Sequence, residues 1–276
     1  MWPEPLCWYG VEKTELDMNW EVFPYFAVVS VVLSLGGALV ALFKPRQAFV
    51  AQVLALAGIG VLGVFVAGFW VSLGRPPMRT MGETRLWYSL FVMMAGFFVY
   101  RRWNYRWLLL FTTVLSAVFC IINMLKPEIH DATLVPALQS VYFIPHVAVY
   151  MFAYGILACS FILAVVGFFD KKNLYFDSMD NLVYIATGLL FLGLLTGALW
   201  AKEAWGDFWS WDPKETWAAV TAAGYLAYIH LRFTRASKSR WLYFVVVVSF
   251  LLLQMCWYGY KYLPSSGQSL HLYNMQ

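Results

Sequence analysis

Long apolar runs, separated by short polar stretches, dominate the pattern of this chain of 276 residues. A helix needs about 20 such residues to cross a hydrocarbon layer of ~30 Å, and most of the runs reach that length. Eight segments can be delimited, at roughly residues 22–43, 47–73, 85–100, 107–125, 141–169, 181–200, 214–231 and 241–262. The ten-residue alternation of a transmembrane β-barrel is absent from the sequence. The pattern predicts an all-α integral membrane protein, a polytopic bundle of about eight transmembrane helices.

The composition agrees with a membrane protein. Of the residues, 62% are hydrophobic and only 12% are charged, which is more apolar surface than one soluble core can bury. A lipid bilayer must therefore solvate most of these side chains. The formal net charge of +4 is scattered over the loops without a basic stripe, which excludes nucleic-acid binding as a function.

Charges between the apolar segments predict the orientation of the chain. Residues 1–20 hold four acidic side chains and one lysine, unlike a secretory signal, so we expect this tail to lie outside. With alternating loops, the inner loops hold eleven lysines and arginines against eight in the outer regions, three of them between Arg75 and Arg85. Because positive charge favours the inner side, we expect both termini on the outer, periplasmic side.

One polar segment, WAKEAWGDFWSWDPKETW at residues 200–217, contains five tryptophans and six charged side chains. Interfacial indoles are common at membrane surfaces and need no further role. Asp212, Pro213 and Glu215 have the pattern of an N-cap, a first-turn proline and a capping box, so they are also consistent with helix architecture alone.

Neither explanation accounts for the spacing of Trp205, Trp209 and Trp211, with Gly206 and Ser210 between them. That spacing places several large rings around a short stretch of backbone, which the small residues allow a ligand to approach closely. Such a surface is typical of a site for a large planar ligand.

The four histidines test whether that ligand is an iron porphyrin, which needs one or two axial imidazoles and an apolar wall. His146 lies about five residues into the fifth segment, ~8 Å below the outer surface at 1.5 Å per residue. His271 lies in the outer tail, nine residues after the last apolar segment. Both can reach a pocket beneath the tryptophans, where nitrogens ~4 Å apart would hold one iron.

The other two histidines lie elsewhere. His230 is ~24 Å down the seventh segment, near the inner face, so it cannot share an iron with His146. It is either an iron ligand or a histidine at the inner headgroup boundary, two positions from Arg232. His130 lies in the polar loop KPEIHDATLVP and is expected to be solvated.

The chain resembles a known family at these residues. WAKEAWGDFWSWDPKETW is similar to the tryptophan-rich WWD signature of haem-handling proteins, and the likeness extends to PALQSVYFIPHVAVYMFAYG, YIHLR and GQSLHLY. Their order and spacing resemble the CcsA (ResC) subunit of the system II cytochrome c synthase from about residue 74 onward. The expected domains are an external tail at 1–21, two transmembrane helices at 22–73 and a haem-handling membrane domain at 74–276, with an external loop at 200–217 and an external tail at 263–276.

The resemblance implies roles for single residues. His146 and His271 would be the axial ligands of an external haem, and His230 would ligate a second, inward-facing haem. The segment that would cradle the external haem runs from Trp205 to Asp212, with Trp205, Gly206, Trp209, Trp211 and Asp212 as its cofactor-binding residues.

The resemblance also implies a function. Haem b (iron protoporphyrin IX) would enter non-covalently at the inner site, pass to the outer one and be joined through its vinyl groups to the CxxCH motif of apocytochrome c. The setting would be a bacterial inner membrane with the tryptophan loop facing the periplasm. A holocytochrome c synthase (haem lyase) activity would be shared with a CcsB (ResB) subunit, and orientation of the reactants would contribute most of the rate, with no catalytic acid or base assigned.

The chain departs from some relatives in LGRPPMRTMGETRLWYS, where Arg75 stands at the position of a histidine. The second ligand of the inner haem is then expected from CcsB, for which no stretch of this chain is a counterpart. Arg75, Arg79 and Arg85 either clamp haem propionates or anchor to lipid phosphates.

The cysteines include no Cys-x-x-Cys pair, which argues against a cytochrome c or a thioredoxin-like reductant. Cys120, Cys159 and Cys256 are expected to be packing residues, and Cys7 is a lone external cysteine.

Three alternatives remain at this stage. A CcmC-type haem-delivery protein shares the WWD signature but has fewer helices. A solute or proton transporter would place His230 in its path, although no internal repeat supports it. A haem-bearing quinone oxidoreductase subunit would present histidine pairs at matched depths on facing helices.

Overall fold

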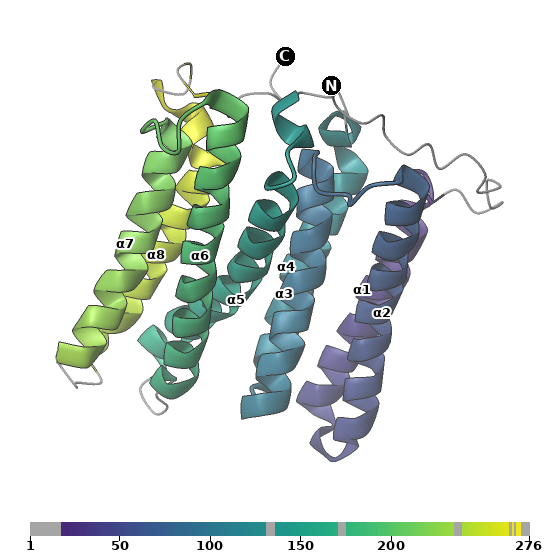
Figure 1. Cartoon of the computed structure of the whole chain (residues 1–276). Coiled ribbons are helices and arrows are strands. Elements are labelled where there is room, and N and C mark those ends of the chain that lie inside the picture. The colour runs from purple at the N-terminus through teal and green to yellow at the C-terminus, as the bar shows by residue number, and fades with distance from the viewer. Residues whose placement is uncertain are drawn as a thin grey trace.

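The computed structural model describes residues 18–130, 136–170, 175–234, 239–264, 267 and 269–271. In this part of the chain the regular structure is entirely helical (Figure 1). The α-helices are α1 (Phe23–Phe43), α2 (Ala48–Leu73), α3 (Met81–Trp103), α4 (Arg106–Leu125), α5 (Phe143–Phe169), α6 (Phe176–Trp205), α7 (Pro213–Thr234) and α8 (Trp241–Trp257). Each apolar segment of the sequence corresponds to one of these helices, and the all-α fold is confirmed.

Five of the helices, α1, α2, α4, α5 and α6, are long and apolar enough to cross a membrane. The apolar helix α8 is shorter, with 17 residues. Both α3 and α7 carry charged side chains in their first and last turns. A membrane protein with several spans is therefore supported, and the eight-span topology with both termini outside stays a prediction.

Consecutive helices run antiparallel and pack as hairpins, with α1 against α2, α3 against α4, α5 against α6 and α7 against α8 (Figure 1). Further contacts of α5 with α3 and α8 join these pairs. The largest cluster of buried side chains lies among α3, α5, α6, α7 and α8 and includes Leu157, Met179 and Tyr243. A smaller cluster lies among α1, α2, α3 and α4. The part of the bundle formed by α3 to α8 carries the candidate site.

Small residues allow α5 and α6 to approach closely. Gly193 and Gly197 stand four positions apart on α6, the spacing of a GxxxG contact between membrane helices. A Cβ atom on Gly193 would lie 2.8 Å from the ring of Tyr150, and one on Gly197 would lie 2.6 Å from the ring of His146. The side chains of α5 thus occupy the space that a larger residue on α6 would need.

One end of the bundle gathers the segments that the sequence singled out. The turn between α6 and α7 and the segment after α8 lie at that end, as do the first turns of α3 and α5 (Figure 1). Helix α7 starts there at Pro213 and ends at Thr234, so His230 belongs to the opposite end. The fold therefore brings the first turn of α5, the tryptophan turn and the residues after α8 to one place.

Candidate functional site

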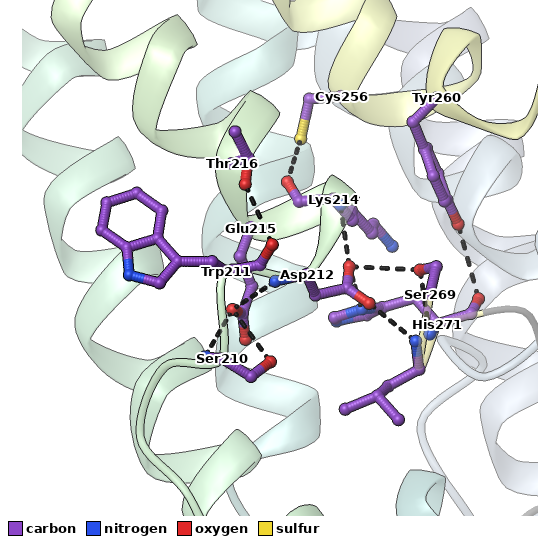
Figure 2. A network of polar contacts seen from close by, with 11 residues as sticks. Ser210, Trp211, Asp212, Lys214, Glu215, Thr216, Cys256, Tyr260, Ser269 and His271 are labelled. Atoms are coloured by element: carbon purple, nitrogen blue, oxygen red, sulfur yellow. Dashed lines mark hydrogen bonds and ion pairs between the residues drawn. The ribbon is translucent and has the colours of Figure 1, made fainter. Parts of the chain in front are cut away.

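The turn between α6 and α7 is fixed by its own polar groups. Gly206 ends α6 in the left-handed conformation, with φ of 93°, and its N–H donates to Lys202. At the start of α7, the Asp212 carboxylate accepts the N–H of Lys214 at 2.8 Å. The Glu215 carboxylate accepts the N–H groups of Asp212 and Ser210 at 3.2 and 2.9 Å. The predicted cap of α7 is confirmed, and Figure 2 shows it beside the chain segment that follows α8.

Trp211 carries the backbone strain of this turn. Its φ of 59° lies in the left-handed region, which a bulky residue occupies at a cost of about 1–3 kcal/mol. The hydrogen bonds on both sides of it hold that conformation. Its side chain is 71% exposed and points away from Asp212 in Figure 2.

Asp212 connects the turn to the residues after α8. Its carboxylate accepts the N–H of Leu270 at 2.6 Å, the hydroxyl of Ser269 at 3.1 Å and Nδ1 of His271 at 3.0 Å (Figure 2). The side chains of His271 and Asp212 are both buried. One carboxylate therefore caps α7 and orients a histidine from a distant part of the sequence.

The ionisation of this pair follows from burial and hydrogen bonding. Burial by itself raises the pKa of Asp212, but the hydrogen bonds from His271, Lys214 and Leu270 outweigh it and lower the pKa to about 2. Burial lowers the pKa of His271 more than the carboxylate raises it. At neutral pH the pair is a carboxylate and a neutral imidazole, with Nδ1 as the donor and the lone pair on Nε2.

His146 is held in a similar way. Its Nδ1 lies 2.9 Å from the carbonyl oxygen of Gly193, which can only accept, so Nδ1 carries the proton and Nε2 the lone pair. The ring packs against Tyr150 at 4.7 Å and Trp200 at 5.5 Å between centroids. The absence of a side chain at Gly197 gives it room.

The two histidines meet at one cavity. Each imidazole centroid lies 5.5 Å from that of Trp200, so the rings are within twice that distance of each other. Both line a cavity whose empty space, including its opening to solvent, is about 1220 Å³. Its aromatic wall includes Trp205 and Trp209, and the Trp205 ring lies 4.8 Å from that of His271. A mostly aromatic wall with two imidazoles facing the same space is the kind of lining that ligand pockets have.

The structure thus brings together four of the residues singled out from sequence, His146, His271, Trp205 and Trp209, with Asp212 behind His271. Gly206 and Trp211 do not line the cavity. In the described part of the chain no group of three or more histidine, cysteine, aspartate or glutamate side chains could hold a bare metal ion.

His230 lies apart from this cavity, on the exposed face of α7 near its end. Beside it, Arg232 pairs with Asp180 at the start of α6 at 2.5 Å, and Tyr228 donates to the same carboxylate. That ion pair joins α6 to α7 at this end of the bundle, and His230 is exposed beside it.

Sequence reasoning missed several cavity residues. Trp200 contacts both imidazoles, and its N–H donates to the carbonyl of Ala137 at 2.7 Å. Cys256 also lines the cavity, and it is a buried free thiol, as are Cys120 and Cys159, whereas Cys7 lies outside the described residues. In the sequence, the only signal for the close contact between α5 and α6 was the Gly193–Gly197 spacing, which is typical of a helix that approaches another helix closely.

The three arginines of the 75–85 segment differ in their surroundings. Arg75 makes a two-point ion pair with Glu83 at 2.8 and 2.9 Å. Nε of Arg85 donates to the hydroxyl of Tyr258 at 3.2 Å. Of the three, Arg79 alone lines the cavity.

His130 is not solvated, so that prediction is wrong. Its ring is half-buried and stacks on Trp20, with centroids 3.9 Å apart and planes 4° from parallel. Gly82 lies beside both rings, where a Cβ atom would be 2.5 Å from Cδ2 of His130 and 3.3 Å from Cζ2 of Trp20. The polar loop composition could not reveal this contact, because Trp20 is more than a hundred residues away.

Comparisons with known proteins give a consistent result. A family model described as cytochrome C assembly protein matches residues 22–266. The cytochrome c biogenesis protein CcsA of Prochlorococcus marinus (strain MIT 9312) is 28% identical over 291 residues, which cover 90% of this chain and 91% of that protein. CcsA of Cuscuta exaltata is 29% identical over 248 residues, covering 75% of this chain and 80% of that protein.

The solved structure of cytochrome c heme lyase CcmF superimposes with a TM-score of 0.66 and 15% sequence identity. The match covers 94% of this chain but 51% of CcmF, so the chain spans about half the length of that structural neighbour. At this identity the likeness shows a shared fold alone.

Proposed function

Because this chain belongs to the cytochrome C assembly protein family, we propose that it binds haem b non-covalently in the cavity described above and presents it for covalent attachment to apocytochrome c. One observation carries this proposal. Two neutral imidazoles, each with Nδ1 held by an acceptor, converge on a single aromatic cavity.

The residues of the cavity fit a haem. Two imidazole Nε2 atoms can hold one iron at about 2.0–2.1 Å each, and the porphyrin supplies the remaining four ligands. The hydrogen bonds to Gly193 and Asp212 fix the tautomer and orientation of each ring. Trp200, Trp205 and Trp209 offer flat apolar surfaces to the macrocycle.

The chemistry needs positioning more than acid-base catalysis. A thiol S–H of the CxxCH motif adds across a vinyl C=C bond, which forms one C–S and one C–H bond without a leaving group. The chain contributes by holding the porphyrin in a fixed orientation toward the thiols. It also excludes other nucleophiles. One axial histidine is then exchanged for the histidine of the incoming motif.

The inner end is proposed as the entry point. His230 would ligate haem there together with a group from a CcsB-type subunit, and its outward-facing position supports a ligand set completed by a second chain. The haem lyase activity would then belong to the pair of subunits. The tryptophan turn would face the periplasmic side of a bacterial inner membrane.

The test removes one axial ligand at a time. His146→Gly and His271→Gly, each purified with its CcsB partner, should lose the outer haem, measured as haem per protein after extraction into pyridine. Maturation of a coexpressed cytochrome c should fall in parallel. His130→Gly is the matched control, because it removes a histidine that lies outside the cavity. Full haem content and normal maturation in both ligand variants would refute the proposal.

A further inference from the structure

We propose that the cavity contains a carboxylate-binding subsite formed by Arg79, Lys214 and Lys261, which takes the two propionates of haem and turns the vinyl edge toward the tryptophan turn. This inference rests on the proposed function and adds the orientation of the ligand to it. Arg79 was already a candidate for binding propionates from the sequence, and the structure adds Lys214 and Lys261.

Three separate elements supply these cations. Arg79 precedes α3, Lys214 lies in the first turn of α7, and Lys261 lies in the 3-10 turn Gly259–Tyr262 that follows α8. All three line the cavity that holds both histidines. Nζ of Lys261 lies 3.4 Å from Sδ of Met81, which joins the start of α3 to the end of α8. Residues far apart in sequence thus place positive charge on one region of the cavity.

The carboxylates nearby are already engaged by other groups. Glu83 pairs with Arg75 and accepts the backbone N–H of Arg79. Asp212 is held by His271 and by backbone N–H groups. In the part of the chain that the structure describes, no ion pair neutralises Arg79, Lys214 or Lys261.

An orphaned polar atom points the same way. Nε of Arg79 is buried and has no hydrogen-bond partner among the described residues. Buried donors in folded proteins nearly always find an acceptor, and a ligand carboxylate or an ordered water would supply one here. A guanidinium matches a carboxylate with two parallel hydrogen bonds, and the two ammonium groups add charge without a fixed direction.

The remaining wall of the cavity is aromatic, in contrast to the positively charged region. Trp205, Phe208 and Trp209 of the α6–α7 turn line it, and Phe208 is 53% exposed. This wall therefore borders solvent, where a polypeptide can approach. Iron protoporphyrin IX carries both propionates on one edge, so anchoring them at Arg79 and Lys261 leaves the vinyl groups to the tryptophan side.

The test compares two iron porphyrins that differ only in the carboxylates, hemin and hemin dimethyl ester. The full chain in detergent at physiological ionic strength is titrated with each, and Kd is read from the Soret absorbance. Wild type should bind hemin at least about ten-fold more tightly than the ester, a difference of about 1.4 kcal/mol. Arg79→Gln and Lys261→Gln should each move that ratio toward one, and Lys261→Arg should preserve it. Because both porphyrins are titrated into the same protein preparation, the ratio of the two Kd values does not depend on the fraction of protein that is folded.

The control is Lys126→Gln, an exposed lysine after α4 that does not line the cavity. A wild-type ratio of one, or a loss of the ratio in Lys126→Gln as large as in Lys261→Gln, would overturn the subsite. Failure of the proposed function would look different, since His146→Gly and His271→Gly would then bind both porphyrins as wild type does. If the histidine variants lose both ligands while the ratio survives in Arg79→Gln and Lys261→Gln, the subsite alone is wrong.

Discussion

A single methyl group on Gly197 should displace His146, the proposed axial ligand on α5. In Gly197→Ala, the new Cβ would lie 2.6 Å from Cε1 and 2.7 Å from Nδ1 of His146. Ordinary van der Waals contact begins at 3.4 Å, so the imidazole must retreat by about 0.8 Å, the difference between 3.4 and 2.6 Å. Iron–nitrogen bonds of about 2.0 Å tolerate only about ±0.2 Å. The required shift is about four times that tolerance.

The energetic consequence follows from overpacking. Added methyl groups in a packed interior cost about 1–3 kcal/mol, which is less than the total stability of a typical protein, so the variant should fold. If that strain is relieved by moving His146 off its bond to Gly193, the outer haem loses the same amount of binding free energy. A loss of 1–3 kcal/mol corresponds to about 5- to 150-fold in affinity.

The assay is hemin titration of the purified chain, with thermal stability measured alongside. Gly188→Ala is the matched control, since Gly188 lies on the same helix and a Cβ there meets no atom within 4 Å. We expect weaker haem binding in Gly197→Ala and wild-type binding in Gly188→Ala. Equal hemin affinity in Gly197→Ala and wild type, at equal stability, would show that the ring position does not matter for haem and would refute the reasoning.

Three further predictions concern the surroundings of the cavity. Asp212→Asn should weaken hemin binding by about 10- to 100-fold, because the partner that orients an iron-ligating histidine usually contributes that much, and unchanged affinity in titration would contradict this. Trp205→Ala should lower haem content more than Trp211→Ala, because Trp211 is 71% exposed outside the cavity; equal losses in the extracted haem would argue against it. Burial lowers the pKa of His130 from 6.5, so the unfolded state binds protons more readily and stability should fall as pH drops below 6.5. The protection factors of the amides at residues 18–24, which correct hydrogen exchange for its intrinsic slowing at lower pH, should then fall between pH 7.5 and 5.5 in wild type, but not in His130→Gln.

The positions of the helices were predictable, because apolar runs long enough to cross a bilayer can form few other structures. The residues at which the helices begin and end were harder to predict. The third segment, expected at 85–100, is a helix from Met81 to Trp103, because the side chain of Thr80 caps the N–H of Glu83 and the Glu83 carboxylate returns to the N–H of Thr80. Hydropathy measures transfer to lipid and does not register such hydrogen bonds. The sixth helix likewise starts at Phe176 through a polar first turn that the apolar count omitted.

The candidate site was predictable in part. The resemblance to CcsA is confirmed, and depth arguments placed His146 and His271 at one end of the bundle, where the structure brings both to one cavity. The direction of each side chain was not predictable, because it depends on contacts between distant segments. Trp211 does not line the cavity, and His130 stacks on Trp20. The role of each site residue in haem binding stays a prediction.

The two histidines proposed as axial ligands are held in place differently. His146 is part of α5 and packs against α6, so displacing it means disturbing two helices. His271 belongs to no helix; its imidazole donates to the Asp212 carboxylate at the start of α7 and packs against Trp200 and Trp205. We therefore expect an incoming imidazole to replace His271 and not His146. The segment that carries His271 can dissociate from the Asp212 carboxylate while the helices continue to hold the porphyrin.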